Sequence, residues 1–65
     1  MKCTIEVNMD NAAFERRPLN ELQRIIAMKM NNIALAGWTP AEGDVDVPLI
    51  DVNGNKVGRL QVEVD

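Results

Sequence analysis

Residues 47–64 read VPLIDVNGNKVGRLQVEV, and the Asn-Gly step at positions 53 and 54 separates two apolar runs within this stretch. An Asn-Gly pair between such runs is the strongest short-range signal for a β-hairpin, because both residues readily adopt turn conformations. The second run also alternates, with Leu60, Val62 and Val64 on one side and polar residues on the other. We therefore predict a hairpin over residues 47–64.

Pro48 and Gly58 indicate where each hairpin strand lies in a sheet. Pro48 has no N–H to donate, so the first hairpin strand is predicted at an edge and the second at the centre. Val57 has the wrong parity to share a face with Leu60, and Gly58 between them is typical of a β-bulge that resets the alternation.

Residues 2–9 (KCTIEVNM) predict a third strand. Apolar and polar residues alternate along this segment, which is typical of an antiparallel strand with one solvated face. The apolar positions, Cys3 among them, are predicted to face the core. Asp10 follows at a position suited to cap a short helical turn over residues 12–14.

Between the strands, residues 18–36 follow the 3.6-residue period of an amphipathic helix. Pro18 suits the first position of a helix, Gly37 suits its left-handed end, and Trp38 is placed to fold back onto the last turn. The stripe predicted to face the core consists of Leu19, Leu22, Ile26, Met30 and Ile33.

These segments predict one α+β domain over residues 1–65 with the order β-α-β-β. A three-stranded antiparallel sheet with one helix packed on one face buries both apolar patterns. The expected elements are a strand over 2–9, a helix over 18–36, an acidic loop over 39–46 and the hairpin over 47–64. The first strand is able to pair with either hairpin strand, and Pro48 favours the last strand as the central one.

Composition limits the classes of function. The chain has 65 residues, a net charge of −3, one cysteine and no histidine or tyrosine. The single cysteine excludes an internal disulfide, and a structural zinc site lacks its usual ligands. So small a domain has marginal stability, which favours tight packing or self-association. No secretory signal or membrane-length apolar run is present, and a free thiol fits a reducing compartment, so we expect a cytoplasmic protein.

The residues also disfavour catalysis and metal binding. Few side chains titrate near neutral pH, and Cys3 is expected to be a buried, inert thiol. Asp51, Asn53 and Asn55 place oxygen atoms at alternate positions, as a calcium loop does. Position six of that loop is Lys56 instead of glycine, and position twelve lacks the bidentate glutamate. We therefore expect no enzyme activity, no cofactor and no metal.

A protein interface is predicted on the helix face opposite the main stripe. Met28 and Leu35 lie seven residues apart on that face, with Ile25 on its flank. Aligned apolar residues on the free face of a small domain favour contact with another protein or with a second copy. Two alternative contact surfaces are the acidic loop, with Glu42, Asp44 and Asp46, and the edge strand near Pro48.

A nucleic-acid-associated factor is the alternative. The basic residues available for phosphate contacts are Arg16, Arg17, Arg24, Lys29 and Arg59. A negative net charge and only two aromatic residues, Phe14 and Trp38, disfavour this alternative, because nucleic-acid binding relies on basic surfaces and stacking platforms.

Three motifs resemble a known group of proteins. DNAAFE at residues 10–15, ELQRII at 21–26 and DVNGNKVGRLQVE at 51–63 are similar to segments of a family of small, uncharacterised bacteriophage and prophage proteins. The chain departs from that pattern in the Met- and Asn-rich second half of its helix, and at Leu60, where an aromatic residue is common. The resemblance implies a phage or prophage accessory protein in the cytoplasm of a bacterial host, and it implies no catalytic residues.

Overall fold

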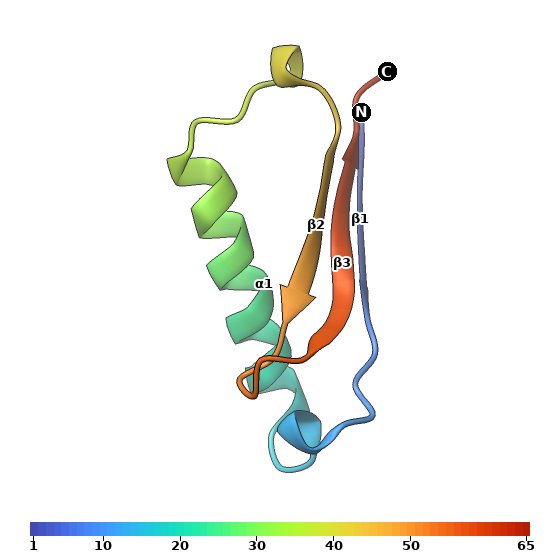
Figure 1. The fold of residues 1–65 in the computed structure, drawn as a ribbon, viewed down its shortest axis with the longest axis vertical. Coiled ribbons are helices and arrows are strands. Elements are labelled where there is room, and N and C mark those ends of the chain that lie inside the picture. Colours follow the sequence, from blue (N-terminus) through green and yellow to red (C-terminus); the bar gives the residue numbers. More distant parts are fainter.

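Strands from both ends of the chain form one antiparallel sheet in the computed structural model, which describes residues 1–65 (Figure 1). The strands are β1 (Lys2–Val7), β2 (Val45–Ile50) and β3 (Lys56–Glu63). Their order in the sheet is β1-β3-β2. The last strand is therefore central, as Pro48 predicts, and the α+β fold with a three-stranded antiparallel sheet is confirmed.

The register places the apolar residues of all three strands on one face. Ile5 lies opposite Leu60 on one side of β3, and Val47 lies opposite Leu60 on the other. Because side chains alternate along a strand, Cys3 and Val7 share this face with Ile5. The opposite face carries the polar residues of each strand.

A bulge in β3 adjusts the alternation at the position marked by Gly58. Leu49 pairs with Gly58 and Ile50 pairs with Lys56, so Val57 is an extra residue in the ladder with β2. Val57 and Leu60 are consequently both buried in the core, although their spacing is odd. The predicted bulge is confirmed.

The Asn-Gly step lies in a five-residue connection, residues 51–55, between β2 and β3. Gly54 has a φ of 84°, whereas no residue other than glycine has a positive φ. Asn53 is therefore outside the left-handed region, and the connection is not a two-residue type I′ turn. The N–H of Gly54 donates to the Asp51 carbonyl, 3.1 Å away, which closes the turn instead.

The helix α1 spans Pro18–Leu35, with the proline in its first turn. Gly37 follows in the left-handed region at φ 75°, as predicted. The indole N–H of Trp38 donates forward along the chain to the Gly43 carbonyl at 3.1 Å. None of the helices combines the length and the apolar content that are needed to cross a membrane.

Two short 3-10 helices flank these elements. The first, η1 (Ala12–Phe14), is capped by Asn11, whose side chain accepts from the N–H of Ala13. The prediction of Asp10 as the cap is wrong by one residue. The second, η2 (Pro40–Glu42), lies inside the predicted acidic loop, and β2 begins at Val45, within the last residues assigned to that loop.

The helix lies over the β2 side of the sheet and contacts β2 and η1 (Figure 1). The buried hydrophobic residues are therefore few and come from η1, α1, β2 and β3, namely Phe14, Ile25, Leu49, Val57 and Leu60. The radius of gyration is 12.6 Å, compared with about 10.7 Å for a compact chain of this length. The chain is thus elongated, and its helix covers only part of the apolar sheet face.

The face of α1 that is buried differs from the predicted one. Ile25, predicted on the exposed flank, is 3% exposed, whereas Leu19 of the predicted core stripe is 71% exposed. Glu21, one turn before Ile25, is buried as well. The carboxylate of Glu21 accepts the backbone N–H of Val52 at 2.8 Å, and this bond ties the helix to the hairpin turn. The centre of the buried stripe therefore runs through Glu21 and Ile25.

The burial of Cys3 also differs from the prediction. It lies on the apolar face of β1, as the alternation predicts, but its side chain is exposed because the helix does not cover this part of the sheet. The thiol is free and accessible, and the prediction of a buried cysteine is wrong.

Candidate functional site

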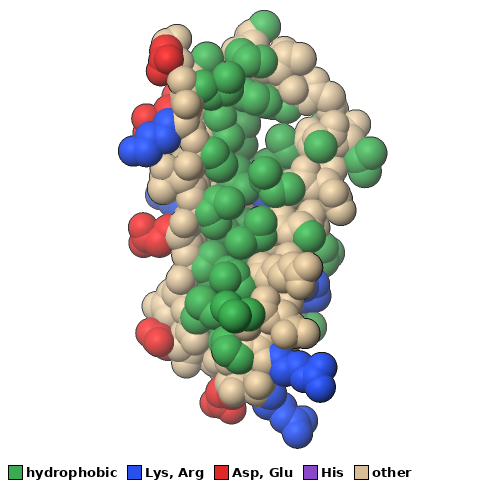
Figure 2. Space-filling model, turned by 180° about the vertical axis from the view of Figure 1, so that it is seen from behind, with side chains coloured by type: hydrophobic (Ala, Val, Ile, Leu, Met, Phe, Trp, Pro, Cys, Tyr) green, Lys and Arg blue, Asp and Glu red, His purple; other side chains and the backbone are tan.

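A continuous surface of apolar side chains runs along the uncovered side of the molecule (Figure 2). We call this surface the apolar band. Ile5 on β1 and Met30 on α1 represent its two sides, with exposed fractions of 39% and 44%. The sheet residues of the band are Cys3, Ile5 and Val7 of β1 and Val62 of β3. On the α1 side we assign to it the partly exposed apolar residues of the predicted stripe, Leu22, Ile26, Met30 and Ile33.

The helical part of the band follows from residue spacing. Leu22, Ile26 and Met30 are separated by one helical turn each, so they share one side of α1. Ile33 continues that side and packs against the core. Four of the five residues predicted as the core stripe thus border the open sheet face instead of being fully covered.

The area of the molecule is consistent with an incomplete covering. The accessible surface is 4720 Å², compared with about 4100 Å² for a typical monomer of the same mass. Apolar patches on monomers rarely exceed a few hundred Å², and larger ones mark sites of interaction. The apolar band gathers exposed apolar side chains on one face of the molecule, and we take it as the candidate functional surface.

The residues predicted on the outer face of the helix differ in their exposure. Met28 and Leu35 are exposed, but Ile25 is buried. Met28 faces a hollow beside Ile50 at the β2 edge, and Arg24 Nη1 lies 3.1 Å from its sulfur. This side of α1 points away from the apolar band.

The three acidic residues of the predicted interface also serve separate local contacts. Glu42 accepts the N–H of Thr39 at 2.9 Å, as in a capping box. Asp44 accepts the N–H of Val64 at 2.8 Å, and Asp46 pairs with Arg59 at 3.2 Å. Each carboxylate therefore has a structural partner, and all three residues remain exposed.

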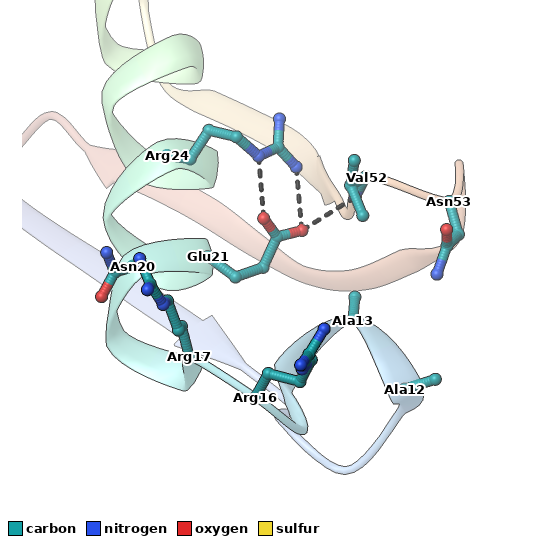
Figure 3. Close-up of a pocket in the computed structure, with 9 residues that line it drawn as sticks. All are labelled: Ala12, Ala13, Arg16, Arg17, Asn20, Glu21, Arg24, Val52 and Asn53. Atoms are coloured by element: carbon teal, nitrogen blue, oxygen red, sulfur yellow. Dashed lines mark hydrogen bonds and ion pairs between the residues drawn. The ribbon is translucent and has the colours of Figure 1, made fainter.

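A second polar feature lies where α1 meets the hairpin turn (Figure 3). Arg24 donates from Nε and Nη2 to the two carboxylate oxygens of Glu21, at 2.8 and 2.9 Å. Hydrogen bonds from Arg24, followed by the N–H of Val52, hold the pKa of Glu21 below its ordinary value despite burial. Sequence reasoning missed Glu21, because it lies on the polar side of the predicted stripe.

Asp51 organises the hairpin turn. Its carboxylate accepts the N–H groups of Asn53 and Asn55 at 2.9 and 2.8 Å, and the side-chain amide of Asn11 at 2.7 Å. Burial raises the pKa of Asp51, but the hydrogen bonds from Asn55, Asn11 and Asn53 outweigh it and leave the pKa lowered. The pattern that resembles a calcium loop is thus a turn whose central carboxylate is held by protein donors. No three His, Cys, Asp or Glu side chains are grouped so that they could hold a metal ion.

Acid is expected to destabilise the protein through these two carboxylates. The ordinary pKa values are 4.5 for Glu21 and 3.8 for Asp51, and both are lowered in the fold. The unfolded chain therefore takes up these protons first as the pH falls. The stabilisation is fully present above the ordinary values and is lost as the pH falls from there through the lower values of the folded state.

Urea denaturation between pH 7 and pH 2, followed by circular dichroism, measures this loss. The Glu21→Gln and Asp51→Asn variants are expected to be less stable at pH 7 and to depend less on pH. Glu15→Gln is the matched control, because Glu15 is exposed and its side chain makes no hydrogen bond. If all three variants keep the wild-type pH dependence, the two carboxylates do not carry it.

The basic residues of the nucleic-acid alternative gather only in part. Arg16, Arg17 and Arg24 line one hollow (Figure 3), but Arg24 is engaged by Glu21. Arg59 pairs with Asp46 on the polar face of the sheet. Nucleic-acid binding stays a prediction.

No protein-family model matches the chain, and comparisons with curated proteins and with solved structures gave no significant match.

Proposed function

We propose that this chain is a small, non-enzymatic accessory protein that acts by binding another protein through the apolar band. The observation that carries this proposal is the exposure of Ile5 directly opposite the fully buried Leu60. The same sheet face is thus core on one strand and surface on the next. An apolar surface of this kind favours association, because burying it lowers the free energy by about 25 cal/mol for every Å² of apolar surface taken from water.

The shape of the band indicates the kind of partner. It follows the long axis of a molecule that measures 40 × 20 × 17 Å, with β1 on one side and α1 on the other (Figure 2). A partner that presents an elongated apolar stripe, such as one face of an amphipathic helix, fits along it. Met30 and Cys3 add soft side chains that adapt to the partner's shape.

The setting of this function is part of the proposal. The DNAAFE and NGN motifs support a phage or prophage origin, and the accessible thiol of Cys3 fits the reducing cytoplasm of a bacterial host. We infer an accessory role because the candidate surface offers contact area and no arrangement of titratable groups for acid-base chemistry.

Site-specific photocrosslinking in bacterial cells tests the proposal. A photoreactive residue in place of Ile5 is expected to give a crosslinked species that contains a second, different protein. The same residue in place of Glu63, which lies on the polar face of the sheet, serves as the matched control. Equal crosslinking from both positions, or none from position 5, would mean that the apolar band is not the binding surface.

A further inference from the structure

The outer edge of β1 consists of backbone groups, whereas the apolar band consists of side chains. The sheet order leaves β1 and β2 as the two edge strands. The β2 edge contains Pro48, and α1 lies against β2 (Figure 1). The β1 edge has neither protection, so its outward backbone groups are open to pairing with another strand.

One hydrogen bond identifies the groups that point outward. The N–H of Asn8 donates to the Val57 carbonyl of the β3 segment at 2.7 Å. In an antiparallel ladder the N–H and C=O groups of a residue point to the same side, and successive residues alternate. The even-numbered residues of β1 therefore bond β3, and the backbone groups of Cys3, Ile5 and Val7 point away from the sheet.

We propose that a second copy of this chain pairs with this edge, as an antiparallel β1–β1 ladder with its two-fold axis at Thr4. In this register Cys3 lies opposite Ile5 of the other copy, and each such pair exchanges two backbone hydrogen bonds. The register thus uses the outward groups and leaves the bonds to β3 intact.

Side-chain charge selects this register among those that the backbone permits. With the axis at Thr4, Lys2 lies opposite Glu6 of the other copy, and Glu6 lies opposite Lys2. Both pairs occupy non-hydrogen-bonded positions, where side chains approach most closely. A shift by two residues in either direction places Lys2 opposite threonine or asparagine and forms no ion pair.

The charges of the neighbouring strand extend this complementarity. Within one chain Lys2 lies opposite Glu63, and Glu6 lies opposite Arg59. A row across the assembled sheet then reads Arg59, Glu6, Lys2 and Glu63, with the last two from the second copy. The charges alternate in sign along the row, which favours this pairing over its shifted alternatives.

The dimer deepens the proposed function, because it names a second copy as one partner of the chain. Two three-stranded sheets join into one sheet of six strands, and the apolar bands become neighbours on the same face. The edge and the band are different surfaces, so the failure of the dimer leaves the crosslinking from position 5 to a different protein untouched. Conversely, an absent foreign partner does not remove the dimer.

Mixing two charge variants tests the pairing without relying on the stability of either. In Lys2→Glu homodimers both cross-strand pairs become Glu–Glu, and in Glu6→Lys homodimers both become Lys–Lys. Each variant alone is expected to dimerise about tenfold more weakly than wild type. An equimolar mixture restores both ion pairs and is expected to form heterodimers with near wild-type affinity, as measured by sedimentation equilibrium with one variant labelled.

A designed cysteine tests the register. Thr4→Cys in a Cys3→Ser background places the two new cysteines opposite each other across the dimer. Their Cα atoms would lie about 4.5 Å apart, a separation that suits a disulfide. Mild oxidation is expected to link this variant, whereas wild-type Cys3, opposite Ile5, links much less. Circular dichroism confirms that each variant is folded.

Three results would overturn the proposal. They are a monomeric wild type at millimolar concentration, a mixture of charge variants that remains monomeric, and oxidation that links Cys3 in preference to the cysteine at position 4.

Discussion

Leu60→Ala is expected to lower the free energy of unfolding by about 2–5 kcal/mol, which is the range for truncating a buried leucine. Leu60 is 0% exposed and lies on the central strand between Ile5 and Val47. The cavity would therefore open on the central strand, within the five-residue core. A domain of this length has a total stability of roughly 3–10 kcal/mol, so this single change removes a large fraction of it.

Urea denaturation followed by far-UV circular dichroism measures the effect. Leu35→Ala is the matched control, because Leu35 undergoes the same chemical change at 87% exposure. We expect the control to stay within about 0.5 kcal/mol of wild type, as surface substitutions usually do. Equal losses at the two positions would show that Leu60 is not at the centre of the core.

Gly58→Ala is the second substitution with a large expected effect. A Cβ at this position would overlap the carbonyl oxygen of Glu6 and lie 2.9 Å from the Val7 Cα. These are backbone atoms of the adjacent strand, so no flexible side chain is able to move aside. The ladder between β1 and β3 must then separate locally, and we expect a loss of at least about 3 kcal/mol.

The control for this variant is Gly37→Ala. Gly37 has a φ of 75° and nothing within 4 Å of an added Cβ, so alanine there costs only about 1 kcal/mol of backbone strain. Amide chemical shifts of β1 complete the test, since Gly58→Ala is expected to perturb them and Gly37→Ala is not. If the two variants lose the same stability, the space between Gly58 and the backbone of β1 is wide enough for a Cβ.

The strands and their order follow from local signals in the sequence. Pro48 disfavours a central position for its strand, and the parity of Val57 requires a bulge near Gly58; both features are present. The helix boundaries at Pro18 and Gly37 are equally local. Such features are predictable because each depends on the backbone requirements of one or two residues.

The orientation of α1 is not a local property, and here the sequence-based prediction is only partly right. Apolar spacing defines a broad stripe from Leu19 to Ile33, but the line of deepest burial depends on where the helix is anchored. That anchor is the hydrogen bond from Val52 to the Glu21 carboxylate. A carboxylate that bonds a turn on a distant segment leaves no periodic trace in the sequence.

The exposure of Cys3 was missed for a related reason. Alternation identifies the face on which a side chain lies, and Cys3 does lie on the apolar face of β1. It does not say how far a single helix reaches across that face. The apolar band is therefore visible only once the helix is known to lie over the β2 side of the sheet.

The small core has a consequence for how the sequence is able to change over generations. Its five buried hydrophobic residues include Phe14, next to the start of α1, and Val57, next to the hairpin turn. Substitutions at this end of the molecule are therefore expected to cost the most folding stability. The far end, which includes Leu35 and the exposed start of β1, is left free to diverge with whatever it contacts, so related chains should keep the turn and vary the opposite tip.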